Sequence, residues 1–229
     1  MNLFNLYKDE LKGFLKSKVM AFLWVGLPIL VIALHFLQSN SADQTISFTL
    51  LSALIVSSLG GTLSAVMLSV SIINEKSRHV YELFLIRPVK RYEIMLAKFF
   101  AVYSCVAVAS LIAVSFGMVS DWVTTGAISQ MVLKNVGESL AISLSMIAVS
   151  CSAGVLIGLV APSILVGAIL VLYGGNSLSV IPLIPTILTD VDPNIFGDIN
   201  TTGFTLGLSC IVTLALLVVA AISFNKKQF

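Results

Sequence analysis

Long apolar stretches without a single charge alternate with short charged stretches along this chain. Five long stretches contain no Asp, Glu, Lys or Arg, and they cover residues 19–42, 44–74, 99–120, 139–189 and 199–225. A helix that crosses the hydrocarbon core needs about 20 residues. Four stretches therefore hold one crossing each, while the 51 residues of 139–189 hold two, joined by a hairpin at Ala161-Pro162-Ser163. The pattern predicts six transmembrane helices.

Composition supports the same class of protein. Apolar residues make up 58% of the chain and charged residues only 10%, whereas soluble domains carry roughly a quarter charged residues. We therefore expect an all-α integral membrane protein in which residues 1–229 form a single transmembrane domain.

The basic residues lie almost entirely on one side of the six-helix arrangement. Of the 13 Lys and Arg residues, only Lys134 falls on the opposite side. By the positive-inside rule the basic side is cytoplasmic, which places both termini in the cytoplasm. The acidic residues leave about +7 inside and −5 outside, so the net charge of +2 conceals a steep asymmetry. We expect a multi-pass protein of the plasma membrane, and the charge gives no reason to expect a nucleic-acid partner.

The first 18 residues are amphipathic. Apolar residues recur at helical spacing, at Leu3, Tyr7, Leu11, Phe14 and Leu15. The more polar side holds Lys8, Asp9, Lys12 and Lys16. This pattern is typical of a helix that lies in the headgroup plane of a membrane. The alternative is that the segment is only the charged flank of the first crossing.

Small and hydroxyl residues follow one face of the second crossing, at Ser57, Gly61, Ser64 and Ser71. Such residues let helices approach closely in lipid, and their hydroxyls form hydrogen bonds across the contact. They fit either a substrate path or plain helix packing. The fourth crossing has a similar series in Ser150, Gly154 and Gly158.

The fifth crossing contains Gly174-Gly175-Asn176 after about half of the depth that a crossing needs. We expect these residues to interrupt the helix, since broken backbone at membrane depth is tolerated where protein or a water-filled cavity covers it. A kinked helix and a half-helix with a re-entrant piece both fit, and so do an outer gate and a simple kink.

The longest charged segment away from the termini lies between the second and third crossings, at residues 74–98. Val80, Leu83 and Phe84 share one side of a predicted short helix, whose polar side includes Glu75, Arg78, His79 and Glu82. Pro88 disfavours helix at the preceding residue, and a new helix starts at or just after it. The segment therefore predicts a helix, an elbow and a second helix that continues into the third crossing.

This segment resembles the signature of ABC-2 type permeases, the membrane subunits of a class of ABC transporters. The matching residues, in order, are Glu75, Glu82-Leu83-Phe84-Leu85, Arg87-Pro88-Val89, Arg91, Glu93-Ile94 and Lys98. The family usually has Gly-Thr where this chain has His79-Val80, and often Gly where it has Ala97. The six-helix layout with both termini inside is also similar.

The resemblance implies a type V exporter-like architecture, with a coupling helix in residues 74–93 that inserts into a separate ATPase subunit. Two ATPase copies would bind ATP and Mg²⁺, and a second permease copy or a paralogue would complete the pathway. This chain itself would be neither catalytic nor a carrier of cofactors. The coupling residues implied are Glu75, Arg78, Val80, Glu82, Leu83, Phe84, Arg87, Pro88, Arg91, Glu93 and Lys98. The residues implied for the pathway or for helix packing are Ser57, Gly61, Ser64, Gly174, Gly175 and Asn176.

The energy source follows from the residues as well. The predicted crossings hold no charged side chain of the kind that ion-coupled transporters use, and the sequence has no G-x-x-x-x-G-K-[ST] phosphate-binding loop. If the chain transports a solute against its gradient, the energy must therefore come from a partner protein. The alternative is a self-contained channel or facilitator, and a membrane-embedded enzyme is disfavoured because no H-E-x-x-H motif or intramembrane aspartate pair is present.

Metal and disulfide chemistry is not expected. Cys105, Cys151 and Cys210 all fall in predicted crossings, where they are interpreted as small apolar residues. His35 and His79 fall on opposite sides of the membrane, so they cannot share one metal ion.

Overall fold

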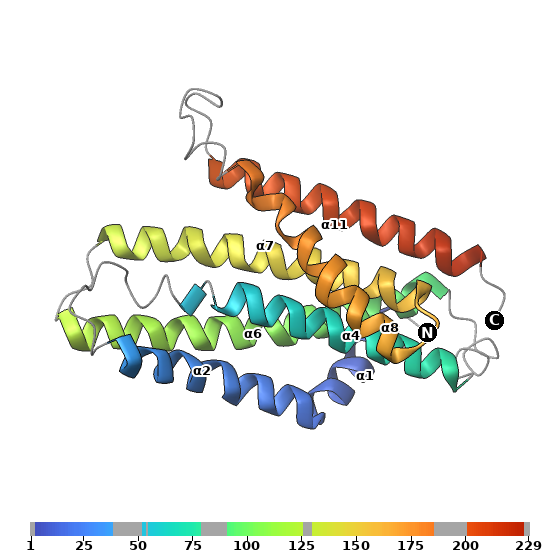
Figure 1. The fold of residues 1–229 in the computed structure, drawn as a ribbon, viewed down its shortest axis with the longest axis horizontal. Coiled ribbons are helices and arrows are strands. Elements are labelled where there is room, and N and C mark those ends of the chain that lie inside the picture. The colour runs from blue at the N-terminus through green and yellow to red at the C-terminus, as the bar shows by residue number, and fades with distance from the viewer. Residues whose placement is uncertain are drawn as a thin grey trace.

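The computed structural model describes residues 3–38, 52–53, 55–78, 91–125, 130–185 and 201–226. Within these ranges the chain is helical and contains no strand. The long helices run roughly side by side along the longest axis of the molecule (Figure 1). The all-α prediction is confirmed, and it follows from the need of apolar backbone to satisfy its hydrogen bonds within each segment.

The chain begins with two helices that meet at a sharp bend. Helix α1 (Leu3–Leu15) is followed by α2 (Lys18–Gln38), and their axes differ by 61°. Between them, the Ser17 backbone N–H donates to the Phe14 carbonyl at 3.0 Å and closes the end of α1. This bend is the geometry expected when an amphipathic helix precedes a membrane crossing.

The next crossing passes through a π-helical turn, η1 (Val56–Gly60), and continues as α4 (Gly61–Ser77). Helix α6 (Arg91–Thr125) is then a single helix of 35 residues. The prediction that the charged residues after the elbow belong to the same helix as the third crossing is confirmed from Arg91 onward. The predicted short helix and its elbow, at residues 79–90, lie outside the described residues.

A tight hairpin joins the two helices of the longest charge-free stretch. Helix α7 (Gln130–Val160) ends directly before residues 161–163, and α8 (Ile164–Leu170) begins directly after them. The Ser163 hydroxyl caps α8 by accepting the Val166 backbone N–H at 3.4 Å. The predicted hairpin is confirmed, and serine at the N-cap explains why the new helix starts there.

The α-helix of the fifth crossing is interrupted at the predicted place, but the backbone stays helical, so the half-helix alternative is wrong and the kinked-helix alternative remains. After α8 the chain continues through η2 (Val171–Gly175), α9 (Asn176–Ser179) and η3 (Ile181–Leu183) as one apolar span. Gly175 and Asn176 keep helical backbone angles, with φ of −64° and −68°. Outside water, breaking helical hydrogen bonds is costly, so the flexible glycines adopt a π-helical turn and the helix does not break.

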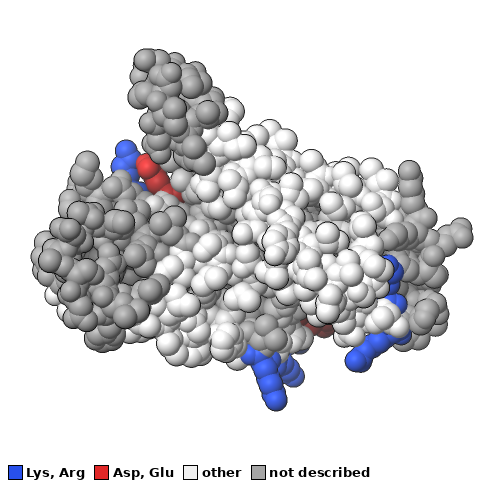
Figure 2. Space-filling model, in the orientation of Figure 1, with Lys and Arg blue, Asp and Glu red and all other residues white. Residues whose placement is uncertain are grey.

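Five helical spans among the described residues are long and apolar enough to cross a membrane, and the bent pair of α1 and α2 would make a sixth. The last of these spans lies within α11 (Thr201–Lys226). On the visible face the middle of the bundle is uncharged, and the charged side chains lie at its ends and beside the bend between α1 and α2 (Figure 2). The chain is therefore a multi-pass helical membrane protein. The side of the membrane on which the termini lie stays a prediction.

The central helices differ from the peripheral ones in burial. In the most apolar part of α6 and of α7, half of the residues are buried inside the chain. In the α8–η3 span and in α11 the corresponding share of buried residues is only 22%. The peripheral helices therefore leave most of their apolar surface open to lipid or to another protein chain. The core lies between α4, α6 and α7.

Candidate functional site

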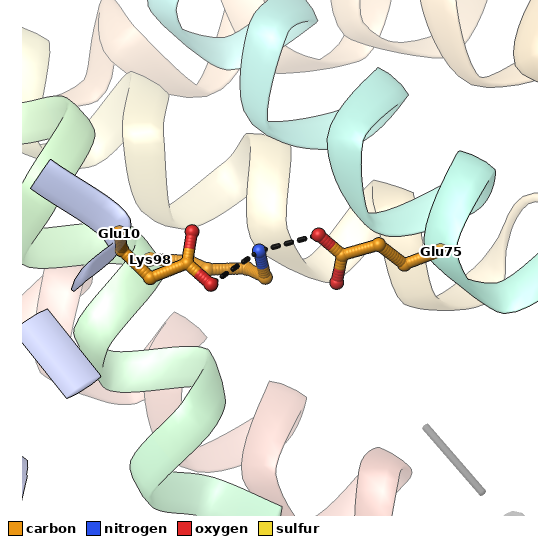
Figure 3. Close-up of polar contacts among 3 residues, drawn as sticks. All are labelled: Glu10, Glu75 and Lys98. Carbon is orange, nitrogen blue, oxygen red and sulfur yellow. Dashed lines mark hydrogen bonds and ion pairs between the residues drawn. The ribbon is translucent and has the colours of Figure 1, made fainter. Parts of the chain in front are cut away.

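Three charged side chains from distant parts of the sequence meet near one end of the bundle. The Lys98 Nζ atom of α6 lies 2.8 Å from Glu10 Oε1 of α1 and 2.6 Å from Glu75 Oε1 of α4. Figure 3 shows the ammonium group between the two carboxylates, each of which comes from a different helix. We call Glu10, Glu75 and Lys98 the Lys98 junction.

The Lys98 junction is largely shielded from water. The Lys98 side chain is 3% exposed, and the side chains of Glu10 and Glu75 are 20% and 23% exposed. Apolar residues surround the lysine, and they leave a cavity of only about 10 Å³ lined by Ile72, Ile94, Met95, Lys98, Leu159 and Phe224. That volume is at the lower limit for a single water molecule. The ion pairs therefore act in a medium that screens charge weakly.

The junction holds two carboxylates and one ammonium group, which leaves an excess of one negative charge. Both carboxylates use Oε1 to accept from the same Lys98 Nζ. The other oxygen of Glu75, Oε2, is buried and accepts no hydrogen bond from the residues that the structure describes. Removing one partner of a buried ion pair is far more costly than removing the whole pair. The stability of this contact therefore depends mainly on Lys98, because Lys98 is shared by both acids.

Helical spacing explains how α1 positions Glu10 next to Lys98. Leu6, Glu10 and Phe14 follow one another at i, i+4 and so lie on one side of α1. Leu6 and Phe14 are buried against the core, and the Tyr7 hydroxyl beside them donates to Ser104 Oγ of α6 at 3.1 Å. Packing of this apolar side on α6 brings the Glu10 carboxylate to Lys98.

Sequence reasoning selected Glu75 and Lys98 but missed Glu10. The signal was available, because Glu10 is an acidic residue in an i, i+4 row with Leu6 and Phe14 on the apolar side of an amphipathic helix. A charged group on that side needs a partner of opposite sign when the helix packs. Its partner could not be found from α1 alone, since Lys98 lies 88 residues further along the chain.

The structure describes only part of the predicted coupling segment. Glu75 and Lys98 are in contact, whereas Arg78 is exposed at the end of α4 and Glu93 is partly buried in the first turn of α6. Arg91 begins α6. The remaining predicted coupling residues lie outside the described residues; they are Val80, Glu82, Leu83, Phe84, Arg87 and Pro88. The role of the segment in coupling stays a prediction.

The small residues of the second crossing pack against α7. Ser57, Gly61 and Ser64 are buried, and a Cβ atom added to Gly61 would lie 3.0 Å from the Ser150 hydroxyl oxygen. The Ser64 hydroxyl donates to the Gly61 carbonyl at 2.8 Å and lies 3.3 Å from the Cys151 sulfur. These contacts are those of close helix packing within one chain.

The predicted pathway residues of the fifth crossing have a different environment. Gly174 and Asn176 are exposed on the outside of the bundle, while Gly175 is buried. A Cβ atom added at Gly174 would meet no atom within 4 Å in the part of the chain that the structure describes. Gly174 therefore faces outward in the single chain, toward the surface that lipid or another chain would cover.

Among the residues that the structure describes, no three His, Cys, Asp or Glu side chains are placed to hold one metal ion.

A scan of the chain against protein-family models gave no match, and a search of curated proteins gave no match either.

Proposed function

We propose that the chain is the membrane-spanning permease subunit of an ABC-2 type transporter, an exporter driven by a separate ATPase. One observation supports the proposal above the others. Glu75 and Lys98, the first and last residues of the family-like signature, form an ion pair of 2.6 Å at the two ends of the segment that would dock on the ATPase.

The proposed assembly contains two ATPase copies, which bind ATP and Mg²⁺, and a second permease copy or a paralogue. This chain contributes the crossing helices and the coupling segment and performs no catalysis. Its place is the plasma membrane, with both termini in the cytoplasm. The largely exposed apolar surfaces of the α8–η3 span and α11 leave room for a second permease.

The geometry explains how force on the coupling segment would reach the membrane. The segment leaves α4 after Ser77 and enters α6 at Arg91, and the ion pair between Glu75 and Lys98 joins the two helices close to these ends. A push on the segment would then move α4 and α6 as one body. Because α6 is a continuous helix of 35 residues, a tilt at one end is carried to the other end of the bundle.

The docking step is tested with Leu83→Asp and Phe84→Asp. A charge on the apolar side of the coupling helix is expected to lower ATPase affinity roughly 30-fold or more, the effect of losing about 2 kcal/mol at an interface hot spot. Co-purification of the ATPase with the tagged chain measures this loss. Val123→Asp, which adds the same charge at an exposed position near the other end of α6, is the matched control.

Undiminished ATPase co-purification with both docking variants would contradict the proposal. Steady solute transport by the chain alone in vesicles, without nucleotide or a second subunit, would indicate a channel or facilitator and would also contradict it.

A second prediction separates coupling from folding. Glu75→Gln removes the excess negative charge and leaves Glu10 paired with Lys98, so the chain should remain folded. ATP-driven transport should nevertheless fall roughly tenfold, within the range seen for residues that carry coupling, while ATP hydrolysis persists. Arg87→Ala should have the same effect. Transport at the wild-type rate in both variants would show that these charges do not transmit force.

A further inference from the structure

The side of α1 that faces away from the core carries a second, independent pattern. Phe4, Lys8, Lys12 and Lys16 follow one another at i, i+4 and form one outward row. All four side chains are exposed, and Phe4 is 69% exposed. Leu6, Glu10 and Phe14 lie on the opposite side of the helix. The outward side therefore combines a basic row with an exposed aromatic residue.

The apolar part of this outward side continues onto the next helix. Leu15 is 46% exposed near the end of α1, and Phe22 and Val25 of α2 are 72% and 59% exposed. Between them Lys18 is exposed at the first position of α2. Lysines thus stand beside an apolar surface that leads directly into a membrane crossing. Figure 2 shows basic side chains that project beside the bend between α1 and α2.

We propose that the outward side of α1 binds the phosphate headgroups of anionic phospholipids. Exposed aromatic and aliphatic side chains of an interfacial helix enter the boundary of the acyl chains, and the flexible lysine stems place their ammonium groups at the level of the phosphates. Each lysine near an anionic leaflet contributes about 1 kcal/mol. Only Asp9 opposes them among the exposed charges of α1.

A lipid fits this surface better than an acidic protein does. A protein that bound only the lysines would leave Phe4 and Leu15 in water, and a protein that covered both would have to enter the membrane beside α2. A lipid molecule matches both chemistries, with a negative headgroup and an apolar tail. This surface lies on the opposite side of α1 from the Lys98 junction, so the inference does not depend on an ATPase partner.

The experiment uses the full-length purified chain in a neutral detergent. Native mass spectrometry measures how much phosphatidylglycerol and how much phosphatidylcholine remain bound at equal concentrations. The double variant Lys8→Gln/Lys12→Gln is expected to lower the preference for phosphatidylglycerol roughly tenfold or more, since each lysine contributes a factor of about five. Lys134→Gln, which removes one exposed basic charge at the other end of the molecule, should leave the preference unchanged.

A charge-preserving variant completes the test. Lys8→Arg/Lys12→Arg should retain the preference for phosphatidylglycerol, because the surface requires positive charge. An unchanged preference in the Gln variant would overturn the proposal. So would equal competition by soluble glycerol phosphate, which would mean a site for free phosphate. Loss of ATPase co-purification in the Gln variant, with lipid preference intact, would assign the surface to a protein partner and would also overturn the proposal.

Discussion

Replacing Lys98 with methionine is expected to destabilise the folded chain by about 3 kcal/mol. Removal of one partner from a buried ion pair typically costs roughly 3–5 kcal/mol, because the remaining charge stays buried without compensation. Here two carboxylates would remain, Glu10 and Glu75, and they would also repel each other. Both keep about a fifth of their side-chain exposure, so water relieves part of the cost and the lower end of that range applies. The free energy of unfolding in mixed detergent and SDS measures the change.

A neutral version of the whole junction provides the control. In the triple variant Glu10→Gln, Glu75→Gln and Lys98→Met, no charge remains buried. Most of the lost stability should return, because the uncompensated charges are gone and the two amides, at positions about a fifth exposed, can bind water. Lys134→Met, at an exposed position, should leave stability unchanged. If Lys98→Met is as stable as the wild type, the three side chains are not held together as an ion pair.

The triple variant also separates two roles of the junction. A contact that only stabilises the fold would leave transport normal once stability is restored. A contact that transmits force would leave a stable chain with weak ATP-driven transport, because the ion pairs between α1, α4 and α6 would be gone. Under the proposed function we expect the second result, measured by efflux from vesicles that contain the ATPase.

Gly154→Ala is expected to have the second largest effect. A Cβ atom at Gly154 of α7 would lie 2.5 Å from the Ala65 carbonyl oxygen and 2.7 Å from the Ala65 Cα atom of α4. Both atoms belong to the backbone, so no side-chain rotation relieves the clash and the two helices must move apart. Overpacking of this kind costs roughly 1–3 kcal/mol and sometimes more. The same unfolding measurement checks the loss.

Helix α7 supplies its own control at Gly137. A Cβ atom there would meet no atom of the described residues around it within 4 Å, so Gly137→Ala should be neutral or stabilising by up to about 1 kcal/mol through higher helix propensity. Equal effects of the two substitutions would show that α4 and α7 do not approach closely at Gly154.

Local rules were sufficient to locate most of the helices. The hairpin before α8 and the continuous helix from Arg91 followed from the absence of charge and from proline, because lipid imposes its length and hydrogen-bond requirements on every segment separately. The same local reasoning predicted an irregularity at Gly174 and Gly175 but could not decide between a kinked helix and a half-helix. Glycine permits a break but does not require one, and the apolar surroundings favour an intact helix.

The Lys98 junction could be predicted only in part. Glu75 and Lys98 were recognisable as charged residues at the two ends of one segment. Their contact required the packing of α4 against α6. The position of Glu10 required the bend of 61° after α1 and the packing of Leu6 and Phe14 on the core. None of these distances is encoded in a spacing along the chain.

The sequence by itself determined that this protein is a bundle of apolar helices and where most of those helices begin and end, because hydrocarbon acts on each stretch of chain according to its own composition. Only the tertiary structure decided that one buried lysine bonds two acids from separate helices, and that Gly154 lies against the backbone of α4. Such contacts join residues far apart in sequence, and they arise from the way whole helix faces fit together.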